Sequence, residues 1–418
     1  MSSMEPTVGT TCLACPVDDP GGATDQKGCA ALKSCDASPT CKPWASCVRA
    51  CEDDNCVSAC DASHPEVARY RQVVYACLCQ TCASVCAPIG VCDRQCDSSK
   101  DLEPVTVAPD NLAQTLLYAT DTEVAPYARS YQPEYPLWSD GALKDRFIYV
   151  PACSRIDTTD MDHWSFPVGT RLWKHFRIPS SNGQDIVPKL VETRFIHRFG
   201  PGADDWVFAA YQWPVDLGAG TVQNPTLAKL VPNGVVNANG TTHDIPSVPQ
   251  CKNCHTKLQE RVLSFGAFQL SHQLAGETIT TISNDGWLTV PAPQGFQPPG
   301  SEIAQAALGY LHANCGNCHN AAFRPVEPPP LMKLLVTQTA LDQTDTVTSL
   351  FNVPTQNVDF VGLDRIEPGS SDKSEIVVRM QRRPPQTGQM PPLATKVVHP
   401  DGVAAISAWI NGLDPSGF

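Results

Sequence analysis

The spacing of apolar and polar positions changes twice along this chain of 418 residues. Between about residues 101 and 249, short runs of aromatic and β-branched residues are separated by Gly, Pro, Asn and Asp, which is typical of strands joined by turns. We expect strands in the segments DRFIYV, GTRLWKHFRI, KLVETRFIHRF and DWVFAAYQW. Residues 101–249 are therefore predicted to form an antiparallel β sandwich or barrel.

The third of these runs divides its side chains between the two sides of a strand. One face carries Val191, Thr193, Phe195, His197 and Phe199. The other face is mostly charged and carries Glu192, Arg194 and Arg198. This alternation supports the strand prediction.

After Pro249 the apolar residues recur at spacings of three or four, which predicts helices. We expect helices over residues 257–274, 301–314 and 401–413. The C-terminal region is thus predicted to be all-α, and the whole chain to be a multidomain α+β protein.

The cysteines define a third zone at the N-terminus. Of the 20 cysteines, fifteen lie between Cys12 and Cys96, spaced by 4 to 6 residues from Cys41 to Cys60. Residues 1–100 are predicted to form a small helical module held together by disulfides. A zinc site that uses Cys12, Cys15, Cys79 and Cys82 is the alternative. The sixteenth cysteine outside the C-terminal region, Cys153, is expected to pair with this module.

Charge and hydropathy restrict the partners and the compartment. The net charge is −13 and no cluster of Lys and Arg stands out, which argues against nucleic acid as a partner. No apolar run approaches the roughly 18 residues of a membrane-spanning helix. The N-terminus lacks the pattern of a secretory signal, yet so many cysteines indicate an oxidising compartment. We expect a periplasmic, secreted or surface protein whose export signal is missing from this chain.

Two short segments carry candidate chemistry, and both match the pattern Cys-x-x-Cys-His, which attaches c-type haem. Two thiols bond to the two vinyl groups of one porphyrin, and the adjacent histidine is then aimed at the iron. A chance match is on the order of a few per cent, and a thioredoxin-like redox pair would need a βαβ context that neither segment has. The predicted haem-binding residues are Cys251, Cys254 and His255, and Cys315, Cys318 and His319.

The region around the second motif, residues 301–418, resembles class I cytochrome c. A helix leads into the motif, a Met-Pro-Pro loop follows, and a final helix carries Trp409 and Ile410, which are expected to pack across Gly309 and Tyr310. The resemblance implies that the methionine of that loop, Met390, is the sixth iron ligand, whereas Met380 is expected to be a packing residue. Ligation by histidine and methionine favours electron transfer over substrate binding.

The first motif has no such partner, because no methionine lies between Cys254 and Cys315. His272 is the first candidate for its sixth ligand and His243 the second, while either histidine could simply be structural. His312 could be structural, contact a propionate or act as a ligand. If none of them binds, the iron held by His255 has an open position.

A wider resemblance covers about residues 130–418. The segments YPLWSDGALKDRFIYVP, HWSFPVGTRLWKHF, DWVFAAYQW, QCKNCH and YLHANCGNCH, in this order, resemble exported bacterial dihaem c-type cytochromes that carry an N-terminal β-rich domain. The resemblance implies two covalent haem c groups but no substrate, and it leaves Trp138, Asp140, Trp173 and Lys174 without an assigned role. We expect four parts: residues 1–100, 101–249, 250–300 with the first haem segment, and 301–418.

Three functions remain open at this point. The first is electron transfer between redox partner proteins outside the cytoplasmic membrane, which needs no catalytic site. The second is a haem peroxidase or oxidase with an open iron at His255, fed by the haem of His319 and Met390. The third is a binding protein whose β-domain holds a glycan or polymer.

Overall fold

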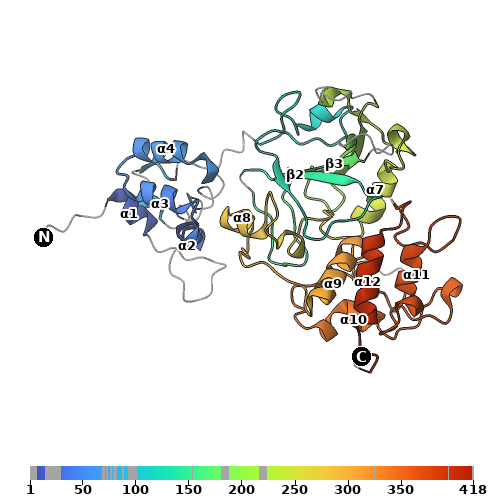
Figure 1. Cartoon of the computed structure of the whole chain (residues 1–418). Helices are drawn as coiled ribbons and strands as arrows, with labels where there is room; N and C mark the ends of the chain where they lie inside the picture. Colours follow the sequence, from blue (N-terminus) through green and yellow to red (C-terminus); the bar gives the residue numbers. More distant parts are fainter. Residues whose placement is uncertain are drawn as a thin grey trace.

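The computed structural model describes the chain from residue 7 to residue 416, with gaps (Figure 1). The described residues are 7–14, 30–67, 71, 74–75, 78, 82–86, 89–92, 101–152, 154–179, 188–215, 224–323, 326–393 and 395–416. The predicted pairing of Cys153 lies outside these residues. Figure 1 shows the N-terminal helices as a separate group beside the β-sheet and the C-terminal helices.

The N-terminal module is built from short helices that disulfides join. Its helices are α1 (Val8–Leu13), α2 (Ala30–Ala37), α3 (Lys42–Arg49), α4 (Asp54–Ser63), the 3₁₀ turn η1 (Pro65–Val67) and α6 (Ala83–Cys86). The disulfides Cys12–Cys86, Cys35–Cys41, Cys47–Cys60 and Cys51–Cys56 surround a small core that contains Trp44. The predicted disulfide scaffold is confirmed.

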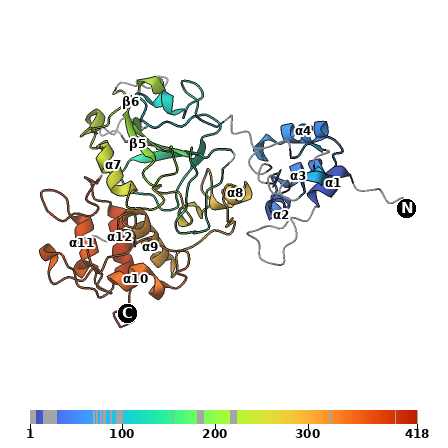
Figure 2. The same cartoon turned by 180° about the vertical axis from the view of Figure 1, so that it is seen from behind.

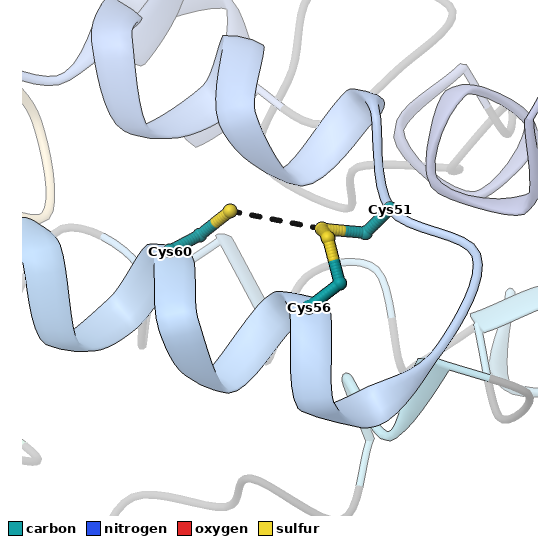
Figure 3. A group of neighbouring side chains, drawn as sticks. All are labelled: Cys51, Cys56 and Cys60. Carbon is teal, nitrogen blue, oxygen red and sulfur yellow. Dashed lines mark hydrogen bonds between the residues drawn. A yellow bond between two sulfur atoms is a disulfide. The ribbon is translucent and has the colours of Figure 1, made fainter.

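Three cysteines of this module lie close enough together to resemble a metal site. Figure 3 shows Cys51, Cys56 and Cys60, and the sulfurs of Cys51 and Cys60 are 3.6 Å apart. All three are consumed by disulfides, so no thiolate is left to bind a metal. Cys12 and Cys82 are also disulfide-bonded, which removes one member of each cysteine pair in the zinc alternative.

The central part is one antiparallel sheet of six strands, in the order β1-β2-β3-β4-β5-β6. The strands are β1 (Arg129–Tyr131), β2 (Leu143–Tyr149), β3 (Arg171–Ile178), β4 (Lys189–Arg198), β5 (Trp206–Gln212) and β6 (Lys229–Leu230). The four predicted strands are confirmed as β2 to β5. The predicted sandwich or barrel is wrong, because the described residues of this region form a single open sheet with β1 and β6 at its ends.

A single sheet suffices here because other parts of the chain cover both of its faces. On one face, Trp173, Phe195 and Tyr211 pack with Leu112 and Leu117 of the preceding segment. The opposite face carries Arg146, Ile148, Leu172, Lys174, Phe176, Glu192, Arg194, Ile196 and Phe208, and we call it the motif face. Its apolar residues pack with the chain that follows the sheet, including Cys251 and Phe265.

The C-terminal half is helical and contains α7 (Val248–His255), α8 (Ile279–Asn284), α9 (Glu302–Asn314), α10 (Asp345–Leu350), α11 (Glu375–Gln381) and α12 (Pro400–Asn411). Short 3₁₀ turns complete the description: η4 (Leu112–Thr115), η5 (Pro225–Leu227), η6 (Ala238–Gly240), η7 (Phe268–Leu270), η8 (Leu341–Gln343), η9 (Val358–Phe360) and η10 (Ser371–Lys373). In both views α7 lies between the sheet and the C-terminal helices (Figures 1 and 2). Among the residues described, no helix combines the length and apolar character needed to cross a membrane.

Two of the three predicted helices are confirmed, as α9 and α12. The helix expected over residues 257–274 is wrong, since this segment holds only the 3₁₀ turn η7. Arg261 and Ser264 have φ angles of 59° and 69°. Left-handed backbone at two nearby residues interrupts a right-handed helix despite the apolar spacing.

Trp409 and Ile410 of the final helix share a core with Tyr310 of α9, and Gly309 has a further neighbour that the sequence did not indicate. A Cβ atom at Gly309 would lie 2.1 Å from the ring of Tyr135, so this residue from before β2 fills the space beside α9. The final helix also approaches Tyr310 through Gly402, where a Cβ would lie 2.4 Å from the Tyr310 ring. Trp409 contacts Phe351, with ring centroids 5.4 Å apart.

We predict that Gly309→Ala destabilises the protein by about 1–3 kcal/mol, because the new methyl group overlaps the Tyr135 ring. The change Tyr135→Ala makes room for it, so the double variant should lose less than the sum of the two single losses. Urea denaturation of the four proteins measures this cycle. Additive losses would contradict the close approach.

A second prediction concerns His197, which is fully buried in the sheet. Its Nε2 atom accepts a hydrogen bond from the Val105 N–H at 3.2 Å, and burial lowers the pKa of His197 to about 4. A lowered pKa means that the unfolded chain binds the proton first, so stability is complete above about pH 6.5 and falls toward pH 4.

The variant His197→Gln should reduce this pH dependence by up to about 3 kcal/mol. The free energy of unfolding, measured by urea denaturation between pH 7 and about pH 4, tests this. His163→Gln, at a partly exposed histidine, is the control and should keep the wild-type slope. An unchanged slope in His197→Gln would refute the assignment.

Candidate functional site

The second Cys-x-x-Cys-His segment follows α9 without a break. Ser301 caps the helix by accepting from the Ala304 N–H, and the helix ends at Asn314. The backbone then turns tightly, since both the Cys318 N–H and the His319 N–H donate to the Cys315 carbonyl, at 3.0 and 2.9 Å. This turn presents the three side chains of the motif together.

Gly316 and Asn320 hold this turn in place. A Cβ atom at Gly316 would lie 2.8 Å from the His312 carbonyl oxygen and 2.9 Å from that of Met332, so a side chain would clash with fixed backbone. The buried Asn320 amide donates to the carbonyls of Gly316 and Asn317, at 3.0 and 3.2 Å. The two residues between the cysteines are thus constrained on both sides.

The motif opens into a cavity of about 510 Å³. Its lining includes Cys315, Cys318, His319 and Met390. Met380 of α11 also lines it, although this side chain is only 5 % exposed and belongs to the core, as predicted. The fold therefore brings together four predicted haem-binding residues that span 76 positions of the sequence.

Met390 owes its position to an arginine. The Met390 N–H donates to the Arg379 carbonyl at 3.1 Å, and the Arg379 Nε donates to the Gly388 carbonyl at 2.9 Å. The guanidinium is in turn fixed by Glu375, at 2.9 Å. The loop is consequently tied to α11, which lines the same cavity.

Burial favours the uncharged forms of the motif side chains in this cavity. It raises the pKa of the Cys315 thiol to about 12 and lowers the pKa of His319 to about 4, the latter aided by the positive charge of Arg379. The Pro330 carbonyl favours the protonated ring and opposes this shift. A neutral imidazole at ordinary pH has a free electron pair for a metal ion.

The first motif lies on α7, which begins with a capping box between Ser247 and Gln250. His255 closes the helix, and its Nδ1 donates to the Arg261 carbonyl at 2.6 Å. The ring lies 5.2 Å from that of Phe208 on the motif face. Burial lowers the pKa of His255 to about 4, so this ring is also neutral.

The two motifs meet through their second cysteines, although 64 residues separate them in the sequence. A hydrogen bond between the Cys318 and Cys254 side chains lowers the pKa of Cys254 to about 7 and raises the pKa of Cys318. Burial raises the pKa of Cys251 to about 11. All four cysteines of the motifs are free of disulfides.

The other candidate histidines are engaged in structural contacts. The Nε2 of His272 donates to the Gln132 carbonyl at 2.6 Å, and its Nδ1 accepts from the Leu274 N–H at 3.0 Å. The Nε2 of His243 lies 2.7 Å from Glu192. In His312 the Nδ1 accepts from the Leu334 N–H at 3.0 Å. The role of His272 as a ligand remains a prediction, and it would require breaking one of these bonds.

Comparison of the chain with protein-family models, with curated proteins and with solved structures found no match. The site therefore has to be interpreted from its own geometry. Sequence reasoning missed Asn320 and Arg379, which hold the motif turn and the Met390 loop. The only signal for Arg379 was its spacing of four from Glu375, which would suit an ion pair if the segment were helical.

Proposed function

We propose that this protein is a dihaem c-type cytochrome that transfers electrons outside the cytoplasmic membrane. The observation that carries the proposal is the single cavity lined by Cys315, Cys318, His319 and Met390. A thiol pair, a neutral imidazole and a thioether that line one cavity form the donor set of a haem with His/Met ligation.

The cavity also fits such a group in size and chemistry. Its volume of about 510 Å³ lies within the roughly 300–1,000 Å³ of typical cofactor pockets. Cys315 and Cys318 would carry the thioether bonds, and His319 and Met390 would provide the axial ligands. The bound iron would supply one-electron redox chemistry, while the protein sets its potential through ligands and burial.

The contact between Cys254 and Cys318 supports a relay. Each of these cysteines would bond to a different porphyrin, so the two groups would be attached at neighbouring points. Electrons would then pass between them within one chain and leave to redox partner proteins. No separate catalytic residue is needed for this function.

The disulfides favour the proposed location. Cys12–Cys86 and the other described bridges of the module require an oxidising environment to persist. Covalent haem and structural disulfides would thus coexist in a periplasmic or secreted protein.

The variant Met390→Ala tests the His/Met site. It should abolish the sulfur-to-iron charge-transfer band near roughly 695 nm, the marker of this ligation, in the spectrum of the oxidised protein. Met380→Ala is the matched control, since Met380 lines the same cavity, and it should retain the band. If the band survives in Met390→Ala but is lost in Met380→Ala, the ligand is Met380 and the assignment of Met390 is wrong.

Pyridine haemochrome analysis should find two haems per chain, and a protein without covalent haem would overturn the proposal.

A haem peroxidase or oxidase is the second candidate, and one observation favours it. Both ring nitrogens of His272 are already hydrogen-bonded, which leaves the iron of the first motif without its leading candidate ligand. If this iron is open, the oxidised protein should show a high-spin EPR signal that cyanide converts to low spin, and it should react with hydrogen peroxide. If both haems are low-spin and react with neither cyanide nor hydrogen peroxide, this function is excluded.

A further inference from the structure

A row of three cations crosses the middle of the motif face. Arg146 on β2 pairs directly with Lys174 on β3, and Lys174 pairs directly with Arg194 on β4. Side chains of directly paired residues lie on the same face with Cβ atoms about 4.5–5.5 Å apart, and like charges in such positions repel each other. We call Arg146, Lys174 and Arg194 the cation ladder.

The described residues supply too few negative charges for this row. Glu192 is the carboxylate that contacts the ladder, at 2.7 Å from Arg194, and it also bonds to His243 at 2.7 Å. Among the described residues, no carboxylate lies within ion-pair distance of Arg146 or Lys174. One carboxylate, already used twice, cannot neutralise three cations.

Arg146 shows the deficit most clearly. The residue is 5 % exposed, and its Nε and Nη2 atoms are buried without a hydrogen-bond partner. Unpaired buried charged groups are costly, and folded proteins generally pair them. A fold that holds these atoms in the core points to a ligand that accepts their hydrogen bonds.

An aromatic ring makes up only part of the deficit. Phe176 lies in the next row of the same face, with Lys174 Nζ 5.1 Å and Arg194 Cζ 4.1 Å from its ring centroid. An aromatic ring attracts a cation more weakly than an anion does. Burial lowers the pKa of Lys174 well below its usual range, and Arg146 lowers it further, as expected for a site that lacks its anion.

The ladder lies beside the first Cys-x-x-Cys-His segment. The ring of His255 lies 5.2 Å from that of Phe208 on the motif face, and Cys251 packs with the apolar residues of the same face. The ladder residues Lys174 and Arg194 remain partly exposed, and so do the cysteines and histidine of α7. Side chains of both the sheet and α7 are thus only partly covered by the described residues.

We propose that the cation ladder binds the carboxylates of a porphyrin attached at Cys251 and Cys254. This inference rests on the proposed function and gives the β-domain a role in it. A porphyrin of the haem c type carries two propionates on the edge remote from its thioether bonds, so its attachment to α7 would place an anionic edge within the protein. The sheet would then neutralise that edge, while α7 holds the opposite one.

Redox titration of the loaded protein tests this binding. Neutralising a ladder cation leaves a propionate uncompensated, which stabilises the oxidised iron and lowers its midpoint potential. The variants Lys174→Met and Arg146→Gln should each lower the potential of the haem at His255, whereas Lys174→Arg should keep it near the wild-type value. Lys229→Gln, on the edge strand β6 of the same sheet, is the control and should leave it unchanged.

The two haems are distinguished by Met390→Ala, which shifts the potential of the His319 haem alone. If two haems are present but the midpoint potential of the His255 haem is unchanged in both Lys174→Met and Arg146→Gln, the inference is overturned. The proposed function would remain intact. A haem count of one or none, with the first motif empty, would instead contradict the proposed function.

Two further measurements show whether a variant has unfolded and whether Lys174 binds the iron directly. Far-UV circular dichroism should show the same sheet content in every variant. A change in spin state in Lys174→Met would mean that the lysine binds the iron itself, and this would also overturn the carboxylate assignment.

Discussion

A single antiparallel sheet has two faces, and both must be kept from water if most of their side chains are apolar. In this protein the segment before β2, with Leu112 and Leu117, covers one face. The chain after the sheet covers the other, and it includes the turn η6 and α7. Within α7, the half-buried Cys251 packs with the apolar residues of this face, which ties the helix that carries Cys254 and His255 to the β-domain.

This arrangement also determines where the second motif lies. In Figure 2, α7 lies between the sheet and the C-terminal helices, on the side from which the second motif approaches the first. Cys254 and Cys318 come into contact there. The two segments are distant in the sequence, but they become neighbours at the interface between the β-domain and the C-terminal helices. Tyr135 and Gly309 also approach each other across this interface.

The sequence was informative wherever a property repeats over short distances. The strands β2 to β5, the helices α9 and α12, and both Cys-x-x-Cys-His segments were predictable from local periods and spacing. The helix over residues 257–274 was not, because its apolar spacing was right but Arg261 and Ser264 adopt left-handed backbone, which apolar spacing does not reveal.

The cation ladder could not be predicted from the sequence, for a different reason. Arg194 was recognised as lying on the polar side of its strand, and Lys174 was left without a role. That these residues stand directly opposite each other depends on the register between β3 and β4, which the bulge near Phe176 shifts by one position. Register is a property of strand pairs, whereas sequence periodicity describes one strand at a time.

The segment before β2 has a consequence for how such proteins can evolve. Trp138 stacks on His399 at 4.0 Å, its backbone N–H donates to the Asn314 side chain, and Asp140 accepts from the Val397 N–H. A C-terminal unit separated near residue 300 would lose these partners and expose the surface they cover. Recombination would therefore favour the transfer of the β-domain and the C-terminal helices as one inherited block, while the disulfide module could be exchanged for another without disturbing these contacts.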